Sequence, residues 1–172
     1  FPRNSFQSKD EKDHLVEVEE NINVGVRFFI SAKTCPTILF FHGNAELSQE
    51  YDDIASVYHN HGCNFIVADY RGYGLSDGFP TKDNLHSDAN NIFSYVKKYL
   101  DENGFNNKLI VMGRSLGSAS SLEILSNHEQ DIDGCIIESG FGTEIPLMRI
   151  LDLTPKDLEF DTAQGFENLR KI

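Results

Sequence analysis

The amino-acid sequence predicts a doubly wound α/β domain, with helices on both faces of a mostly parallel sheet. Four short, nearly continuous apolar runs are typical of strands that are buried on both faces. Segments with apolar residues at helical spacing alternate with these runs, as they do in domains of this class. With 172 residues, of which 40% are hydrophobic, the chain can bury one sizeable core, so we expect a single domain.

The N-terminal part predicts an antiparallel hairpin. Residues 15–18 and 24–28 alternate between apolar and polar side chains, which is the pattern of half-buried strands. We expect this hairpin at one edge of the sheet. Residues 1–14 are polar and charged without periodicity. We therefore interpret them as a polar leader, and residues 15–172 as the N-terminal and central part of one domain.

Strands and helices alternate in the central part. Apolar runs at 37–41, 64–68, 108–112 and 135–137 predict the parallel strands. One apolar stripe at helical spacing comprises Leu47, Tyr51, Ile54 and Tyr58, and a second comprises Leu85, Ala89, Ile92, Val96 and Tyr99. A third helix is expected from about residue 116 to 126, where the small residues Ser118, Ala119 and Ser120 allow a close approach to the sheet.

Charge, hydropathy and cysteine content narrow the possible classes of protein. The formal net charge is −12, which disfavours nucleic acid as a partner because nucleic-acid binders carry basic surfaces. No stretch of the sequence approaches the roughly 18 apolar residues that a membrane span requires. The chain has an odd number of cysteines, Cys35, Cys63 and Cys135. This favours free thiols in a reducing compartment, so we expect a cytoplasmic location.

A G-x-S-x-G pentapeptide, residues 113–117, follows the apolar run at 108–112. Between a strand and a helix, this motif forms a sharp turn that exposes the serine hydroxyl, which makes Ser115 the candidate nucleophile. Glycines are required because a Cβ at the flanking positions would collide with neighbouring backbone. The N–H of Leu116, at the positive end of the helix, would face a developing oxyanion. The alternative interpretation of the motif is a flexible turn.

The segment His42-Gly43-Asn44 follows the apolar run at 37–41. A second oxyanion-binding N–H comes from a loop in this position when the nucleophile sits on such a turn. We expect Asn44 to supply it, with Ala45 as the alternative donor. His42 invites interpretation as a base or ligand, but it precedes the turn, so we expect it to form hydrogen bonds within the loop.

A third motif, D-Y-R-G-Y-G-L-S at residues 69–76, follows the apolar run at 64–68. In order and spacing, the three motifs resemble the α/β-hydrolase superfamily, and within it the small serine hydrolases grouped with serine aminopeptidases and prolyl-oligopeptidase relatives. The resemblance runs from about residue 15 to the end of the sequence. It implies hydrolysis of an ester, thioester or amide through an acyl-enzyme on Ser115, with a small-molecule acyl or peptide substrate and no cofactor or metal.

The resemblance also implies a Ser-Asp-His triad in chain order. His128, the histidine after Ser115, lies about 18 Å along the predicted helix at 1.5 Å per residue, too far to act as the base. No later aspartate follows an apolar strand in the expected manner: Asp131, Asp133, Asp152, Asp157 and Asp161. We therefore expect the acid and the histidine beyond residue 172, together with the last strands of the fold, because residues 165–172 resemble the stretch before the acid-bearing strand.

Several alternatives accompany this interpretation. Glu138, at the end of a predicted strand, could stand for an acid placed one strand early, or could cap the following turn. Residues 145–151 lie where the superfamily inserts a substrate cap, and packing of a short helix on the core is the other interpretation. The glycines at 72, 74 and 78 fit a dinucleotide-binding motif poorly, and His59 and His61 are poor joint metal ligands. The alternative function is that of a non-catalytic binding or scaffold protein.

Overall fold

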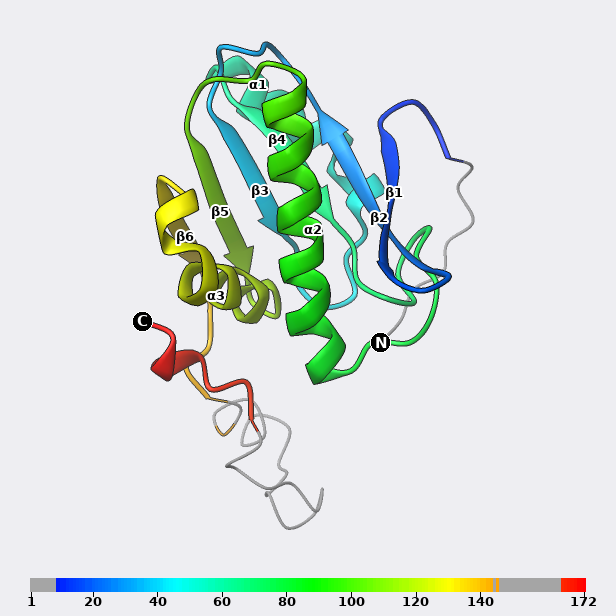
Figure 1. The fold of residues 1–172 in the computed structure, drawn as a ribbon, viewed down its shortest axis with the longest axis vertical. Helices are drawn as coiled ribbons and strands as arrows, with labels where there is room; N and C mark the ends of the chain where they lie inside the picture. The colour runs from blue at the N-terminus through cyan, green and yellow to red at the C-terminus, as the bar shows by residue number, and fades with distance from the viewer. Residues whose placement is uncertain (1–8, 144, 146–164) are drawn as a thin grey trace.

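The computed structural model describes residues 9–143, 145 and 165–172, and these form one mixed sheet with helices on both faces (Figure 1). The six strands of this described part run in the order β1-β2-β4-β3-β5-β6. Their bounds are β1 Asp13–Glu19, β2 Ile22–Phe29, β3 Thr37–Phe41, β4 Asn64–Ala68, β5 Leu109–Arg114 and β6 Gly134–Glu138. The last four strands pair in parallel, which confirms the predicted α/β class with a mostly parallel sheet.

The predicted antiparallel hairpin is confirmed as β1 and β2, at one edge of the sheet. Asn21 turns the chain between the two strands with a left-handed φ of 62°. β1 begins at Asp13, so the last two residues of the expected leader belong to the hairpin. β2 also pairs antiparallel to β4 and so connects the hairpin to the parallel strands.

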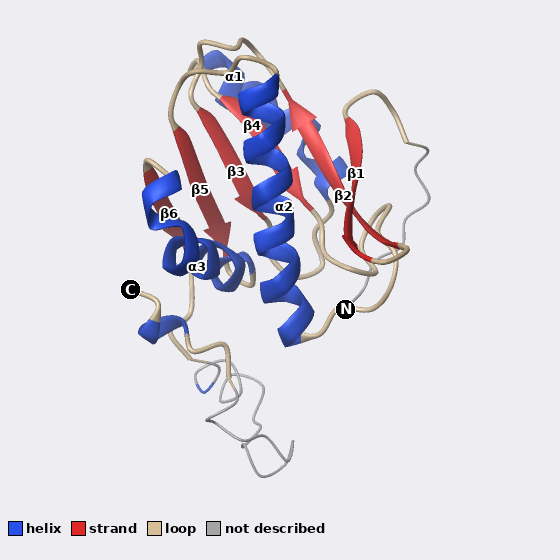
Figure 2. Ribbon diagram, viewed as in Figure 1, coloured by secondary structure: helices blue, strands red, loops and turns tan. Residues whose placement is uncertain are grey.

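Helices α2 (Lys82–Glu102) and α3 (Gly117–His128) lie on one face of the sheet, and α1 (Asp52–Asn60) lies on the other (Figure 2). Alternate residues of each central strand pack on opposite faces, as the pleat requires. In β3, for example, Leu39 and Phe41 join the core beneath α2, whereas Ile38 and Phe40 join the core beneath α1. All five residues of β3, and all five of β4, are buried, as predicted for strands covered on both faces.

The second and third predicted helices are confirmed, but the first is partly wrong. Residues 48–51 form a 3₁₀ turn, and α1 begins only at Asp52. A 3₁₀ turn has a different periodicity from an α-helix, so the stripe counted from Leu47 does not continue in phase. Ile54 is 43% exposed, and Ala55, 1% exposed, packs on the sheet in its place.

β6 differs from the expectation of a strand buried on both faces. Ile136 and Ile137 are 44% and 40% exposed, because β6 is the outer strand of the described sheet and has a neighbour only on the β5 side. The three cysteines are free thiols and half-buried.

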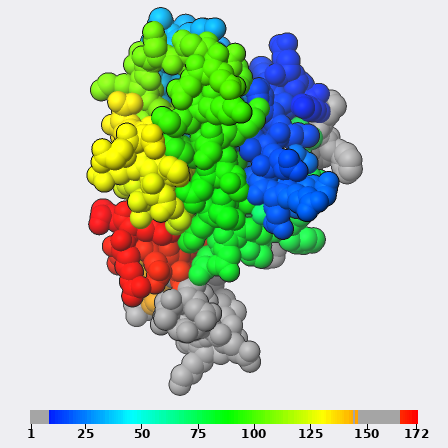
Figure 3. Space-filling view, viewed as in Figure 1, coloured from blue at the N-terminus to red at the C-terminus, as the bar shows by residue number. Residues whose placement is uncertain are grey.

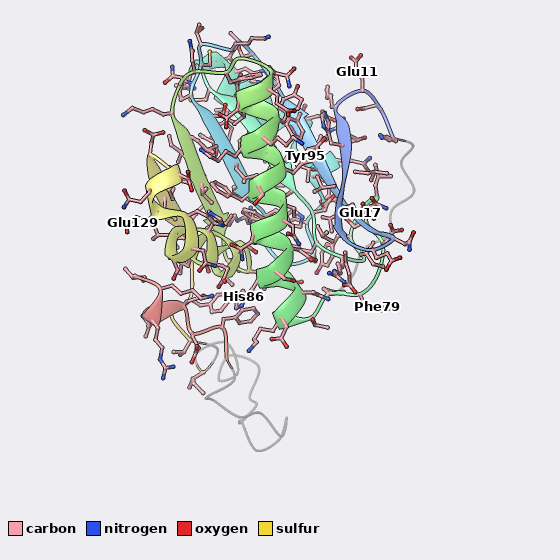
Figure 4. The ribbon with its side chains drawn as sticks, in the orientation of Figure 1. Glu11, Glu17, Phe79, His86, Tyr95 and Glu129 are labelled. Atoms are coloured by element: carbon pink, nitrogen blue, oxygen red, sulfur yellow. The ribbon has the colours of Figure 1, made fainter. Side chains whose placement is uncertain are left out.

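Residues 165–172 lie against α2 and α3 (Figure 3). Lys171 forms an ion pair of 2.7 Å with Glu123 of α3, and the buried Asn168 donates from Nδ2 to the carbonyl of Phe141 at 2.8 Å. His86, near the start of α2, faces this segment (Figure 4) and contacts the ring of Phe166 edge-on. Residues 146–151 of the expected cap segment lie outside the described residues, as do Asp152, Asp157 and Asp161.

Candidate active site

Ser115 sits on an abrupt turn between β5, which ends at Arg114, and α3, which begins at Gly117. Its φ of 51° lies in the left-handed region, which is strained for a residue with a side chain and persists only when the surroundings enforce it. The Ser115 N–H donates to the carbonyl of Glu138 on β6 at 2.9 Å. Its carbonyl accepts from the N–H and the hydroxyl of Ser118, at 3.0 and 2.6 Å. These bonds anchor the turn on both sides.

The glycines of this turn are required by close packing, as the sequence predicts. A Cβ at Gly113 would overlap the carbonyl of Gly117 and the hydroxyl of Ser121. A Cβ at Gly117 would overlap the carbonyl oxygen of Phe41, the last residue of β3. The absence of a side chain at Gly117 therefore lets the start of α3 abut the end of β3. Residues 113–117, the Ser115 turn, are thus brought against the chain that leaves β3.

The chain that leaves β3 forms the His42 loop, residues 42–46. β3 lies between β4 and β5, so the crossover from β3 to β4 and the next one, from β4 to β5, run in opposite directions across the sheet. Parallel α/β sheets bind ligands in the crevice at the carboxyl ends of strands flanking such a switch point. The Ser115 turn and the His42 loop both lie there.

His42 has the structural role that the sequence predicts. It is fully buried, its Nδ1 donates to the carbonyl of Gly43 at 2.7 Å, and its Nε2 lies 3.0 Å from Oδ1 of Asp69. Asp69, itself 1% exposed, also accepts from the N–H and the hydroxyl of Ser48, at 2.8 and 2.6 Å. The pair therefore connects the His42 loop to the loop after β4.

The motif at residues 69–76 supports the His42 loop. The hydroxyl of Tyr70 donates to the carbonyl of His42 at 2.5 Å, and the hydroxyl of Tyr73 donates to Oδ1 of Asn44 at 2.8 Å. Burial raises the pKa of both tyrosines, most strongly for Tyr70, so both hydroxyls keep their protons and remain donors. The N–H of Ala45 bonds the Tyr73 hydroxyl, which limits the rise in the Tyr73 pKa. Ala45 has a left-handed φ of 62°.

Two charged residues of the site were not identified from the sequence. Arg114, which directly precedes Ser115, forms an ion pair of 3.0 Å with Glu46 of the His42 loop. Arg114 also lies 4.0 Å from the half-exposed carboxylate of Glu138. The sequence gives only a weak signal for this pair. Arg114 lies within the G-x-S-x-G motif and Glu46 lies just after His42-Gly43-Asn44, but no sequence pattern indicates that the two side chains meet.

All six histidines lie in the described residues, and no hydrogen bond there joins any of them to Ser115. His128, at the end of α3, bonds Oδ1 of Asn90 at 3.1 Å, consistent with its exclusion as a base. Asp133 accepts from the N–H of Leu109 at 2.8 Å, and Asp131 pairs with Lys97. Neither aspartate has a contact with the Ser115 turn.

The rejected signals have structural explanations. The glycines at 72, 74 and 78 have positive φ angles in a loop, and α2 begins only at Lys82, so they do not open a helix. Nδ1 of His61, one of the two histidines rejected as joint metal ligands, donates to the carbonyl of Val57.

Within the described residues, no helix combines the length and apolarity needed to cross a bilayer.

The fold and the arrangement at this sheet edge define the class of protein as an α/β-hydrolase. The model of the serine aminopeptidase S33 family matches residues 32–154, which is more than half of the sequence. The chain therefore belongs to this family.

Relatives agree with this assignment. The chain is 28% identical over 117 residues to the alpha/beta hydrolase domain-containing protein WAV2 of Arabidopsis thaliana, covering 67% of this chain and 37% of that protein. It is 30% identical over 112 residues to protein bem46 of Schizosaccharomyces pombe, covering 64% and 37%. The match thus spans just over a third of these relatives. The esterase Pf2001 of Pyrococcus furiosus has the same fold, with a TM-score of 0.69 at 17% identity over 99% of this chain and 70% of that one.

Proposed function

We propose that the protein is a serine hydrolase that cleaves an ester, thioester or amide bond through an acyl-enzyme on Ser115. The observation that carries this proposal is the left-handed Ser115 between β5 and α3. Strain of this kind is concentrated at functional sites. The two glycines of the turn allow packing so close that other atoms occupy the space a Cβ would fill at each position.

The proposal assigns the oxyanion hole to the backbone N–H groups of Asn44 and Leu116. Leu116 stands at the N-cap of α3, where the N–H groups lack intrahelical partners and the helix dipole favours negative charge. For the second donor the proposal takes Asn44, which ends the His42-Gly43-Asn44 segment after β3, with Ala45 as the alternative. No cofactor takes part in this mechanism.

The proposal places the general base and its acid after Ile172. Among the described residues, no histidine forms a hydrogen bond with Ser115. The match to the relatives spans 37% of their length. On this assignment residues 1–172 expressed alone should turn over p-nitrophenyl acetate close to background. In a serine protease, loss of triad members costs on the order of a million in kcat.

The test is labelling of the protein at its full natural length with a fluorophosphonate probe, which reports an activated serine hydroxyl. We expect labelling in the wild type and none in Ser115→Ala. Ser139→Ala is a matched control, because Ser139 is exposed, follows β6 and has a similar φ of 50°. Labelling that persists in Ser115→Ala would show that another residue is the nucleophile. A wild-type protein that is never labelled would favour the non-catalytic binding or scaffold function.

A further inference from the structure

We propose that Glu46 is a positioning residue that sets the oxyanion donor of Asn44 relative to Ser115. It would do so by joining the His42 loop to the Ser115 turn. This inference rests on the proposed function, and the experiment below separates the two.

The carboxylate of Glu46 accepts from three groups on three parts of the chain. Oε2 accepts the N–H of Gly43 at 2.8 Å and the hydroxyl of Tyr51 at 2.6 Å, and Oε1 pairs with Arg114 at 3.0 Å. Burial and the neighbouring Glu46 carboxylate raise the pKa of Tyr51, so its hydroxyl remains a donor. Glu46 is only 23% exposed, and its carboxylate is therefore held in one place.

The bond to Gly43 orients the His42–Gly43 peptide, which lies one peptide before the Gly43–Asn44 peptide that carries the Asn44 N–H. Glu46 reaches back three residues to the Gly43 N–H, which closes the His42 loop on itself around the left-handed Ala45. A Cβ at Gly43 would lie 3.0 Å from Oε1 and 3.2 Å from the carboxyl carbon of Glu46. An alanine at position 43 would therefore displace the carboxylate of Glu46 by a few tenths of an ångström from its observed place.

The bond to Arg114 fixes the same carboxylate to the neighbour of Ser115. Arg114 is the last residue of β5, where it pairs with Glu138 of β6, and the preceding Gly113 is paired with both β3 and β6. One carboxylate thus ties the peptide before the proposed donor to the residue before the proposed nucleophile. The Asn44 N–H and the Ser115 hydroxyl must keep a defined separation, because the oxyanion has to accept from the N–H while its carbon is attached to the Ser115 oxygen.

The physical consequence is an effect on the transition state. An oxyanion-hole bond strengthens only as charge develops, so a misplaced donor lowers kcat and leaves KM nearly unchanged. A general loss of folding would instead reduce the fraction of active protein, with the surviving molecules working normally.

The experiment measures kcat and KM for p-nitrophenyl acetate, and the rate and final extent of fluorophosphonate labelling, in the protein at its full natural length. For Glu46→Gln we expect kcat to fall about tenfold to a hundredfold with KM within about twofold. Labelling should be slower by a similar factor but reach the wild-type extent. Gly43→Ala, which keeps Glu46 but displaces its carboxylate by a few tenths of an ångström, should lower kcat in the same way but by a smaller factor, with KM again nearly unchanged.

Two further variants make the test specific. Glu50→Gln is the matched control, because Glu50 also accepts a backbone N–H three residues earlier, that of Leu47, and it should stay within about twofold of the wild type in kcat. Arg114→Gln should lower kcat. Adding it to Glu46→Gln should cost little more than Glu46→Gln alone, since variants that remove the same contact are not additive.

An unchanged kcat in Glu46→Gln, a change in KM alone, or a kcat loss matched by a smaller labelled fraction would each overturn the inference. Any of these results, with Ser115 labelled normally in the wild type, would leave the proposed function standing. Absence of wild-type labelling would overturn both.

Discussion

The hydroxyl of Tyr73 donates a hydrogen bond to Oδ1 of Asn44 at 2.8 Å. The two residues come from loops after different strands, β4 and β3. The contact engages the Asn44 side chain in support of its loop. In the proposed mechanism, only the backbone N–H of Asn44 acts on the substrate.

This division of roles predicts a mild effect of Asn44→Ala. The variant keeps the backbone N–H, so kcat/KM for p-nitrophenyl acetate should stay within about tenfold of the wild type. Loss of a side-chain oxyanion donor would cost roughly a hundredfold or more. A loss of that size would show that the side-chain amide, and not the backbone N–H, is the donor.

Gly117→Ala should strongly destabilise the protein, because a Cβ there overlaps the carbonyl of Phe41 and backbone on both sides must move. We expect the free energy of unfolding in urea to fall by about 3 kcal/mol or more. Gly134→Ala is the control: Gly134 lies in β6 with open space at its Cβ position, and the change should stay within about 0.5 kcal/mol. Equal effects of the two variants would contradict the packing argument.

Asp13→Asn should break a buried ion pair that fixes the start of the hairpin. Arg27 is 5% exposed and Asp13 is 3% exposed, with 2.7 Å between them. Burial opposes the charge of Arg27, but the bonds to Asp13 and Asp10 outweigh it and raise the pKa of the guanidinium. Removal of one buried partner should cost about 3 kcal/mol, measured by urea unfolding. Asp53→Asn, at an exposed position in the first turn of α1, should cost less than about 1 kcal/mol.

Stability should fall as the pH falls below about 6.5, partly through His86. Burial, and then the positive charge of Lys171, lower the pKa of His86 below its ordinary value of 6.5. The folded state therefore binds this proton less readily than the unfolded state, so the contribution of His86 is complete above pH 6.5 and is lost as the pH drops towards the folded-state pKa. His86→Asn should reduce the difference in unfolding free energy between pH 7.0 and pH 5.5. If the difference in unfolding free energy stayed as large in His86→Asn as in the wild type, the pH dependence would come from other titratable groups.

The fold could be predicted from the sequence because its signals are local. Apolar runs such as 37–41 and 64–68 can bury their side chains on both faces of a strand only when the sheet is covered by a layer on each side. The stripe from Leu85 to Tyr99 fits one face of a helix. The prediction was wrong where a local pattern was interrupted. The 3₁₀ turn at Ser48–Tyr51 moved Ile54 to the surface, and the outer position of β6 left Ile136 and Ile137 exposed.

The sequence by itself determined the class of the domain, the turn that carries Ser115 and the loop that carries Asn44, because each depends on residues adjacent in the chain. Only the tertiary structure decided which side chains hold these two segments together. Glu46 and Arg114 are 68 positions apart in the numbering but 3.0 Å apart in space, and Tyr73 reaches Asn44 from a third loop. Such contacts arise from the order β4-β3-β5 in the sheet. Hydrophobic periodicity specifies which face of a strand is buried, but not which strands become neighbours.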